Sequence, residues 1–382
     1  MLHHIFKITA LLVFSGVMFS ACSDPVSTEP IEDYSAGFPP MPPAPEMKGF
    51  SYTSFSKDAF QRGEALGTLE DLKAQTNTDF VALCVFEFQS NDSSADIAPN
   101  TTGRNPVTGE GWSTTSTLED LRNGIRHARR NGMKIVIKPH VDSYAGGWRA
   151  SIKPDMEGKW FESYTAMMLK YAKLAQEENV EMICIGVEYL VATQEKYHPH
   201  WREMITKIRQ VYSGKLTYAA NWSGQSFWGL PTAEYKQVKF WDALDYIGID
   251  GYYPMASVFN STPSFTSAVK RMRGYAAEAK AEADKYGKKV ILMELGLQSV
   301  KGALVQPYEH TLGTKAGAIP DYEIQEFYYR VMIEAFGSQP WCAGMFWWNW
   351  DSVNNPTQKT NYTVKDKSAA KVLKEWYSKV AS

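Results

Sequence analysis

The sequence predicts a single (β/α)8 barrel, and three observations lead to this prediction. Apolar runs of strand length alternate with stretches of helical periodicity from about residue 47 to the carboxyl terminus. Eight strand–helix pairs occur without a break in composition, which is the number that closes a parallel barrel. The connections after the strands are long and those before them are short, as in barrels whose strand-to-helix loops build the active face.

Eight segments have the length and composition of buried strands. In chain order they are residues 49–53, 80–88, 134–139, 182–188, 216–221, 246–250, 289–294 and 344–348. Between them lie segments with the apolar spacing of amphipathic helices, at residues 66–76, 118–131, 160–178, 201–212, 265–286, 321–336 and 368–377, with a weaker one at 233–241. A doubly wound open sheet is the alternative architecture. The glycine-rich phosphate turns typical of such sheets, GxGxxG and GxxxxGK[ST], do not occur in the sequence.

The longest connections follow the second, third and seventh predicted strands, at residues 89–117, 141–159 and 296–320. The turns from helix to strand, such as Asn131-Gly132 and Tyr286-Gly287-Lys288, are tight. We therefore expect the functional cleft at the carboxyl ends of the strands.

The first 21 residues predict an export signal that is not part of the fold. Lys7 precedes an apolar run over residues 8–19, which is too short to span a bilayer. Phe19-Ser20-Ala21-Cys22 resembles a bacterial lipobox, in which the cysteine takes a lipid and becomes the first residue of the mature chain. A plain signal peptide with a coincidental Cys22 is the alternative. We expect an exported lipoprotein, periplasmic or at the outer-membrane surface, that meets the membrane only through this lipid.

Residues 22–46 are rich in Pro, Ser and acidic residues and have no periodicity, so they predict a flexible tether before a barrel domain at 47–382. The mature chain keeps Cys84, Cys184 and Cys342, each inside an apolar run and without a CxxC partner. They predict buried thiols, and neither a disulfide framework nor a zinc site. We expect no metal and no organic cofactor.

Composition narrows the class of ligand. The 40 Lys and Arg against 42 Asp and Glu give a formal net charge of -2, without the basic excess that nucleic-acid binding needs. Aromatic residues make up 13% of the chain, and several stand beside polar residues. Such rings suit carbohydrates, whose C–H groups pack on a ring face while their hydroxyls form hydrogen bonds.

Glu188 and Glu294 end the fourth and seventh predicted strands. An ionisable group that closes an apolar strand is costly to bury unless it is paired or used in chemistry. Hydrolysis of a glycoside with retention needs a carboxylate nucleophile and a carboxylic acid proton donor, about 5–5.5 Å apart. Either residue alone is equally well explained as a structural rim acid paired with Lys or Arg. Together, on two strands that can face each other across a barrel mouth, they favour catalysis.

Short motifs at the strand ends resemble those of clan A glycoside hydrolases, and within this clan those of family 113, the β-mannanases. They are Lys138-Pro-His-Val-Asp142 with Gly147-Trp-Arg149, Ile185-Gly-Val-Glu188, Ala219-Ala-Asn-Trp222, Asp245-Tyr-Ile-Gly-Ile-Asp250, Met293-Glu-Leu-Gly296 and Phe346-Trp-Trp-Asn-Trp350. The resemblance runs from Lys48 to the carboxyl terminus, and the order of the motifs, one per strand end, makes it specific. It implies hydrolysis of β-1,4-mannosidic bonds in mannan or manno-oligosaccharides, with Glu188 as acid/base and Glu294 as nucleophile.

This mechanism sets requirements on the surroundings of the two glutamates. Glu188 must start protonated, so its pKa must be raised by desolvation or by the carboxylate of Glu294. Tyr252 is a candidate hydrogen-bond donor to Glu294, or else a packing residue of the turn after the sixth strand. Trp347 or Trp348 should form the floor of the sugar pocket; alternate residues of a strand face opposite sides, and the motif favours Trp347.

The other polar or aromatic residues at strand ends are candidates for contacts with sugar hydroxyls. They are His140, Trp148, Arg149, Asn221, Trp222 and Asp250. Asp250 has a second interpretation, as a cap of the turn that follows it. One position departs from the clan pattern, in which Asn before the acid/base binds the sugar 2-hydroxyl: this chain has Val187 there. Recognition of the 2-hydroxyl must therefore come from elsewhere.

Two further hypotheses remain open at the level of sequence. The first is an exo-acting β-mannosidase or another β-glycosidase, because long loops are able to close one end of a cleft. The second is a non-catalytic carbohydrate-binding lipoprotein that uses the same aromatic face. Substitution of each glutamate distinguishes the enzyme from the binding protein.

Overall fold

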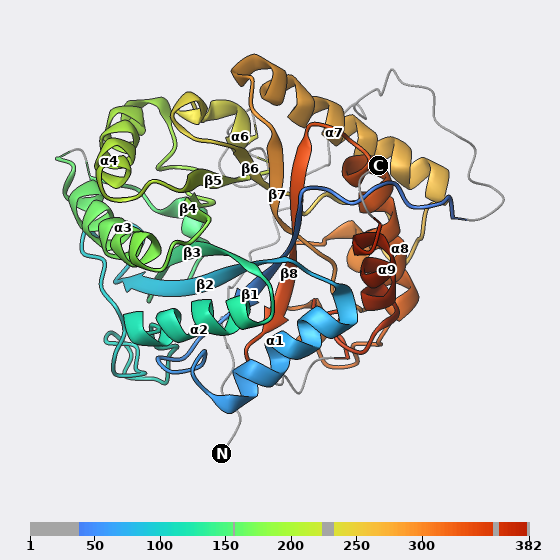
Figure 1. Cartoon of the computed structure of the whole chain (residues 1–382), viewed down its shortest axis with the longest axis horizontal. Coiled ribbons are helices and arrows are strands. Elements are labelled where there is room, and N and C mark those ends of the chain that lie inside the picture. Colours follow the sequence, from blue (N-terminus) through green and yellow to red (C-terminus); the bar gives the residue numbers. More distant parts are fainter. Residues whose placement is uncertain (1–37, 156, 224–232, 354–358, 380–382) are drawn as a thin grey trace.

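The computed structural model describes residues 38–155, 157–223, 233–353 and 359–379. Within them, eight parallel strands close into one barrel in the order of the sequence, and helices surround it (Figure 1). The strands are β1 (Met47–Thr53), β2 (Phe80–Gln89), β3 (Lys134–Ser143), β4 (Met182–Val187), β5 (Lys215–Asn221), β6 (Ile247–Asp250), β7 (Val290–Leu295) and β8 (Cys342–Asp351). The helices are α1 (Gly63–Thr76), α2 (Leu118–Arg130), α3 (Lys159–Glu177), α4 (His198–Val211), α6 (Glu234–Gln237), α7 (Phe265–Tyr286), α8 (Tyr322–Met332) and α9 (Ser368–Tyr377). The predicted (β/α)8 barrel is confirmed.

Side-chain caps fix where several helices begin. The side chains of Thr117, Ser264 and Asp321 accept hydrogen bonds from backbone N–H groups in the first turns of α2, α7 and α8. Two predicted helices differ from the structure. The segment 233–241 contains only the single turn α6, and α8 ends at Met332, after which the chain continues as a π-helical turn over Ile333–Gly337.

The inside of the barrel is apolar near the amino ends of the strands. Its cluster of side chains comprises Met47, Phe80, Ala82, Val136, Met182, Cys184, Val187, Ala219, Ile291, Met293, Ala343 and Phe346. Gly49 has no room for a side chain, because a Cβ there would lie 2.4 Å from the ring of Phe346. Farther along the strands, the buried charged residues Lys138, Asp250 and Glu294 replace the apolar ones. The floor of the barrel is thus hydrophobic and its mouth is charged.

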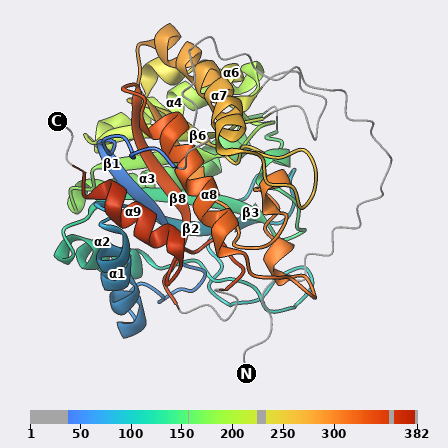
Figure 2. The same cartoon turned by 90° about the vertical axis from the view of Figure 1, so that its right-hand side faces the viewer.

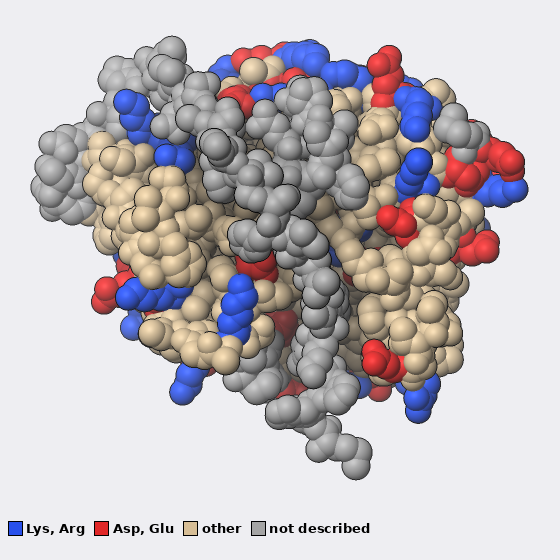
Figure 3. Space-filling view, turned by 180° about the vertical axis from the view of Figure 1, so that it is seen from behind, with Lys and Arg blue, Asp and Glu red and all other residues tan. Residues whose placement is uncertain are grey.

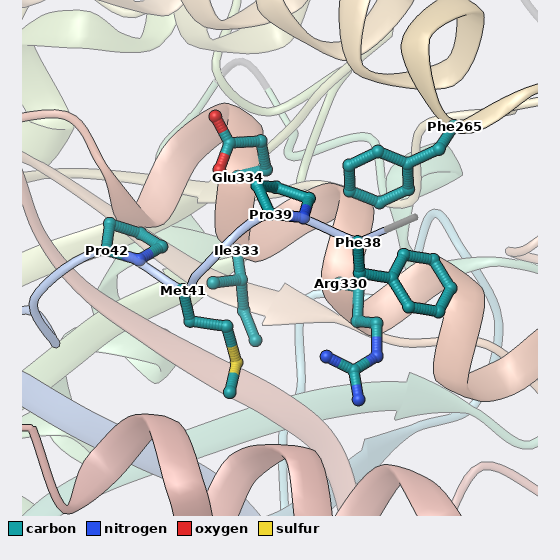
Figure 4. A pocket seen from close by; sticks show the side chains of 8 residues that line it. All are labelled: Phe38, Pro39, Met41, Pro42, Phe265, Arg330, Ile333 and Glu334. Atoms are coloured by element: carbon teal, nitrogen blue, oxygen red, sulfur yellow. The ribbon is translucent and has the colours of Figure 1, made fainter. Parts of the chain in front are cut away.

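The folded domain begins before residue 47. The ring of Phe38 packs edge-on against Phe265 at 5.2 Å, and the guanidinium of Arg330 lies 4.7 Å from the centre of the Phe38 ring (Figure 4). The carbonyl of Pro42 accepts a hydrogen bond of 3.0 Å from Nε1 of Trp376. Residues 38–46 of the predicted tether therefore include segments that pack on the barrel, and residues 22–37 lie outside the described residues. The predicted signal peptide and Cys22 lie outside the described residues.

Two simpler properties of the fold bear on the sequence predictions. Cys84, Cys184 and Cys342 are free and buried, and burial raises the pKa of each thiol to about 12. No helix in the described part of the chain has the length and apolar character needed to cross a membrane.

Candidate active site

The loops that follow the strands gather on one face of the barrel, on the right of Figure 2. Figure 3 views this face and shows acidic side chains in a hollow near its centre, whereas Lys and Arg lie mostly around the rim. The two strand-end glutamates of the sequence prediction, Glu188 and Glu294, are 8% and 5% exposed.

Glu294, on β7, is held through both of its carboxylate oxygens. Nζ of Lys138, from β3, lies 2.5 Å from Oε1, and the hydroxyl of Tyr252 donates a hydrogen bond of 2.8 Å to Oε2. Lys138 is completely buried, so its charge is not screened by water. A cation thus contacts one carboxylate oxygen of Glu294, and a hydroxyl donor contacts the other.

Glu188 follows β4 in a left-handed backbone conformation, with φ of 57°. Residues other than glycine rarely adopt it, and such strain is concentrated at functional sites. Nε1 of Trp148 donates a hydrogen bond of 2.9 Å to Oε2 of Glu188, and Nη1 of Arg149 lies 3.3 Å from the same oxygen. Within the described residues, Oε1 has no hydrogen-bond partner, so it is the oxygen left for a substrate.

The pKa of Glu188 is raised above its ordinary value. Burial is the largest cause, and the negative charge of Glu294 is the next. The cation of Arg149 and the hydrogen bond from Trp148 act in the opposite direction without cancelling this shift. The surroundings of Glu188 therefore disfavour its charged form, whereas Glu294 is bound by a cation and a hydroxyl donor.

Trp148 and Arg149 contact the acid directly and are not free rim residues. Arg149 also binds Asp142, with Nε at 3.0 Å and Nη2 at 2.8 Å from Oδ1. Burial alone would lower the pKa of Arg149, but Asp142 and Glu188 raise it, so the guanidinium stays charged. Arg149 thus fixes the position of the Glu188 carboxyl from the rim of the site.

Asp250 lies at the end of β6, next to Glu294 of β7 in the register of the sheet. Its side chain is completely buried, and Oδ1 is 3.7 Å from Nζ of Lys138. A carboxyl with no exposed surface does not reach a sugar, so the predicted contact with substrate is wrong for Asp250. Its carboxylate oxygens have no hydrogen-bond partner among the described residues, which also excludes the alternative of a turn cap.

His140, on β3, lies in an aromatic wall of the site. Its ring centre is 4.7 Å from that of Phe86 and 6.3 Å from that of Trp348. Burial holds the pKa of His140 well below its usual range, so the ring is neutral. In the described parts of the chain both ring nitrogens are buried and neither has a hydrogen-bond partner.

Of the two tryptophans of β8, the structure places at the mouth of the barrel the one that the motif did not favour. Trp347 is completely buried on the outside of the barrel, where its ring stacks on Tyr329 at 4.0 Å and its Nε1 donates to the hydroxyl of Tyr377 at 2.9 Å. Trp348 is half-buried and packs against the cluster of Cys84, Phe86 and Phe88. The prediction that Trp347 forms the sugar floor is therefore wrong, and Trp348 is the ring at the mouth.

Asn221 and Trp222 follow β5 but have different surroundings. Asn221 is 4% exposed, and its backbone N–H and Nδ2 both donate to Oε2 of Glu234, at 2.8 and 2.7 Å. Burial raises the pKa of Glu234 to about 7. Trp222 is half-buried and packs edge-on against Tyr253 at 5.5 Å, with the ring of Tyr308 farther out at 6.4 Å. Asn221 is thus held by the fold, and Trp222 belongs to an aromatic cluster beside the mouth.

The described residues contain no group of three His, Cys, Asp or Glu side chains that is able to hold a metal ion. The polar groups of the mouth are its carboxyls and the cations Lys138 and Arg149.

A model of Glycoside Hydrolase Family 113 matches residues 49–367. The chain belongs to this family. Among solved structures, one described as a family 113 β-1,4-mannanase complex is 26% identical, with a TM-score of 0.72 over 87% of this chain and 99% of that chain. The family 113 β-mannanase AaManA from Alicyclobacillus acidocaldarius, in complex with ManMIm, is 24% identical, with a TM-score of 0.73 over 88% of this chain and 98% of that one. No curated protein matches the chain.

More distant structures share the fold. The β-glucuronidase of Ruminococcus gnavus is 14% identical and has a TM-score of 0.55, over 87% of this chain and 50% of that chain. Membership in family 113 makes the protein a glycoside hydrolase, and the resemblance expected from the strand-end motifs is confirmed.

Sequence reasoning missed two residues of this glycoside hydrolase that the structure places around the site. Lys138 was part of a motif but had no assigned role, because a lysine in an apolar strand gives no sign of the acid it faces. Glu234 lies in the weakly predicted helix, and its polar sequence gave no sign of a completely buried carboxyl. The signal that was available for Lys138 is its place inside an apolar strand of a chain that has three acids at strand ends.

Proposed function

We propose that this glycoside hydrolase cleaves β-1,4-mannosidic bonds of mannan or manno-oligosaccharides with retention of configuration. The observation that carries the proposal is the difference between the surroundings of the two carboxyls. Glu294 is held between Lys138 and Tyr252, and Glu188 has a raised pKa and one oxygen that has no hydrogen-bond partner among the described residues. A charged nucleophile and a protonated acid at one mouth are what a two-step displacement requires.

In the first step Glu294 attacks the anomeric carbon, and Glu188 gives its proton to the departing glycosidic oxygen. The bond from sugar to leaving group breaks as the ester between sugar and Glu294 forms. The negative charge thereby moves from Glu294 to Glu188. Arg149, which lies 3.3 Å from Oε2 of Glu188, stabilises the charge that appears there.

In the second step Glu188 acts as base. With the charge of Glu294 consumed by the ester, the second cause of the high pKa of Glu188 is absent, and its carboxylate accepts a proton from water. The water oxygen attacks the anomeric carbon, the ester bond breaks, and Glu294 regains its charge. Tyr252 and Lys138 are in place to stabilise the departing carboxylate.

The mannan assignment is supported by relatives. Solved structures of family 113 that resemble this chain are described as β-1,4-mannanases. A second candidate, another retaining β-glycosidase, is favoured by Val187, whose side chain is buried in the apolar interior of the barrel and has no group to bind a 2-hydroxyl.

Product analysis on mannans, glucans and xylans, combined with NMR of the anomer first released, tests the proposal. We expect β-configured products from mannan and a mixture of chain lengths if cleavage is internal. Single sugars alone would indicate exo action, and binding without hydrolysis of any glycan would indicate the non-catalytic lipoprotein. Glu294→Ala should abolish hydrolysis, and full activity of this variant on every substrate would remove Glu294 from the role of nucleophile.

We also propose export and lipid attachment at Cys22, on the basis of the lipobox-like sequence. Metabolic labelling with a radioactive fatty acid in a bacterial host should mark the wild-type chain and not Cys22→Ala. Cleavage without label would indicate the plain signal peptide.

A further inference from the structure

The mouth of the barrel contains an acid that the two-step mechanism leaves without a role. Asp250 is completely buried, and none of the described residues forms a hydrogen bond with either of its carboxylate oxygens. A buried polar group without a partner costs free energy, so such a carboxyl is expected only where it serves a purpose. Its nearest cation is Lys138, whose Nζ lies 3.7 Å from Oδ1.

Lys138 faces both acids. An ammonium group has three N–H donors, and two of them point to Oε1 of Glu294 at 2.5 Å and to the carbonyl of Met293 at 3.3 Å. The third remains for Asp250. Because Lys138 has no exposed surface, water is not available to stabilise its charge, and a carboxylate must do so.

This need changes during the reaction. Formation of the ester removes the charge of Glu294, and the negative charge then sits on Glu188, which is bound by Arg149. Lys138 is left in the barrel beside an uncharged ester. The carboxyl within reach of its Nζ is then Asp250.

We propose that Asp250 is a positioning residue that takes over as the counter-ion of Lys138 while Glu294 is esterified. This inference rests on the proposed two-step function. Asp250 forms no bond to the sugar. It lets the hydrogen bond of Lys138 move from Glu294 to Asp250 when the ester forms, and back again when water cleaves the ester.

The charges around Asp250 support an exchange of one proton with solvent in each half-cycle. In the free enzyme, burial first and the charge of Glu294 second hold the pKa of Asp250 well above its usual range, and Lys138 acts against them. Arg149 lowers this pKa in both states, and the charge that appears on Glu188 raises it less than the charge of Glu294 does. The thiol of Cys184 also faces this group. Loss of the Glu294 charge lowers the pKa of Asp250, and a proton is released until the ester is cleaved.

Pre-steady-state kinetics of Asp250→Asn test the proposal with the 2,4-dinitrophenyl β-glycoside that the wild type hydrolyses best. Asparagine keeps the volume and has no charge for Lys138. We expect ester cleavage to slow about tenfold or more, since one partner of a buried ion pair is lost. A burst of dinitrophenol should appear, and kcat and KM should fall together, so that kcat/KM changes less than about threefold.

A purely structural role predicts a different result. The burst rate and the steady-state rate of Asp250→Asn would then fall equally. Either this outcome or ester cleavage at the wild-type rate overturns the proposal. The matched control is Asp245→Asn, which changes a carboxyl held by Arg209 and Lys215 just before β6, and it should leave both rates unchanged. A wild type that forms no glycosyl-enzyme refutes the proposed function itself.

A second measurement does not depend on the folding of Asp250→Asn. Glu188→Gln removes the proton of Glu188, and a 2,4-dinitrophenyl 2-deoxy-2-fluoro glycoside needs no acid to lose its leaving group. Trapping of the ester in this variant should release about one proton per active site into a weakly buffered indicator solution. Complete trapping without proton release contradicts the proposal.

Discussion

The hydroxyl of Tyr252 donates a hydrogen bond of 2.8 Å to Oε2 of Glu294, on the side of the carboxylate opposite to Lys138. Each oxygen of the nucleophile therefore has its own donor. One donor is neutral and comes from the loop after β6, and the other is charged and comes from β3. This arrangement fixes the plane of the carboxylate.

Tyr252→Phe should lower kcat/KM by about 10- to 100-fold, because a hydrogen bond to a charged group contributes about 1.5–3 kcal/mol. Steady-state kinetics of wild type and variant on an aryl glycoside measure this loss of kcat/KM. The matched control is the neighbouring Tyr253→Phe, since no described residue accepts from that hydroxyl. Equal losses in the two variants would mean that Tyr252 acts through packing alone.

Glu188→Ala should slow natural polymers far more than aryl glycosides with good leaving groups in the first step. Acid assistance contributes typically about 10²–10⁴-fold, and a leaving group such as dinitrophenolate departs without it. Rates on the two substrate types, measured for wild type and variant, provide the comparison. If both substrates lose activity to the same extent, Glu188 is not the acid.

Arg149→Met should move the alkaline limb of the pH–activity profile to higher pH. Arg149 is the main cation that lowers the pKa of Glu188, so its removal lets burial and Glu294 raise this pKa further. Glu188 then keeps its proton to higher pH, although kcat falls because the new charge on Glu188 loses its partner. Arg202→Met, which removes an exposed cation bound to Asp242, is the control and should leave the profile unchanged. A shift to lower pH would contradict the electrostatic role of Arg149.

Glu234 should make the protein less stable as pH rises. Its pKa is about 7 in the folded chain against an ordinary value of 4.5, so between these values the folded state binds more protons than the unfolded state. The free energy of unfolding therefore falls from about pH 4.5 to about pH 7, by roughly 3 kcal/mol for this group. We expect the free energy of unfolding of Glu234→Gln, relative to that of the wild type, to rise by up to that amount between pH 5 and pH 8. Urea unfolding at the two pH values measures this difference. A stability difference independent of pH would contradict the shift.

The architecture was predictable because strand and helix periodicities are local signals. Thr117, Ser264 and Asp321 begin helices at or next to the residues that the sequence indicated. Glu188, directly after β4, and Glu294, near the end of β7, were predictable for the same reason, since a charged residue at the end of an apolar run is visible without any knowledge of tertiary contacts.

Residues whose environment depends on tertiary packing were not predictable. Alternation along β8 requires that Trp347 and Trp348 face opposite sides, but strands of a parallel barrel are buried on both faces. The apolar run Phe346-Trp347-Trp348 therefore does not show which of its residues face the inside of the barrel. The position of Asp250 beside Glu294 is likewise set by the register of β6 and β7, which no sequence pattern records.

The two tryptophans of β8 offer a matched pair of variants. Trp347→Ala should destabilise the protein by about 3–5 kcal/mol, because it removes a completely buried ring that stacks on Tyr329 and binds Tyr377. Trp348→Ala should change the unfolding midpoint much less, since this ring is half-buried, but should raise KM through loss of a surface beside His140. Urea unfolding and steady-state kinetics of both variants make the comparison. The opposite pattern, a stable Trp347→Ala with a raised KM, would mean that Trp347 forms the floor of the sugar pocket.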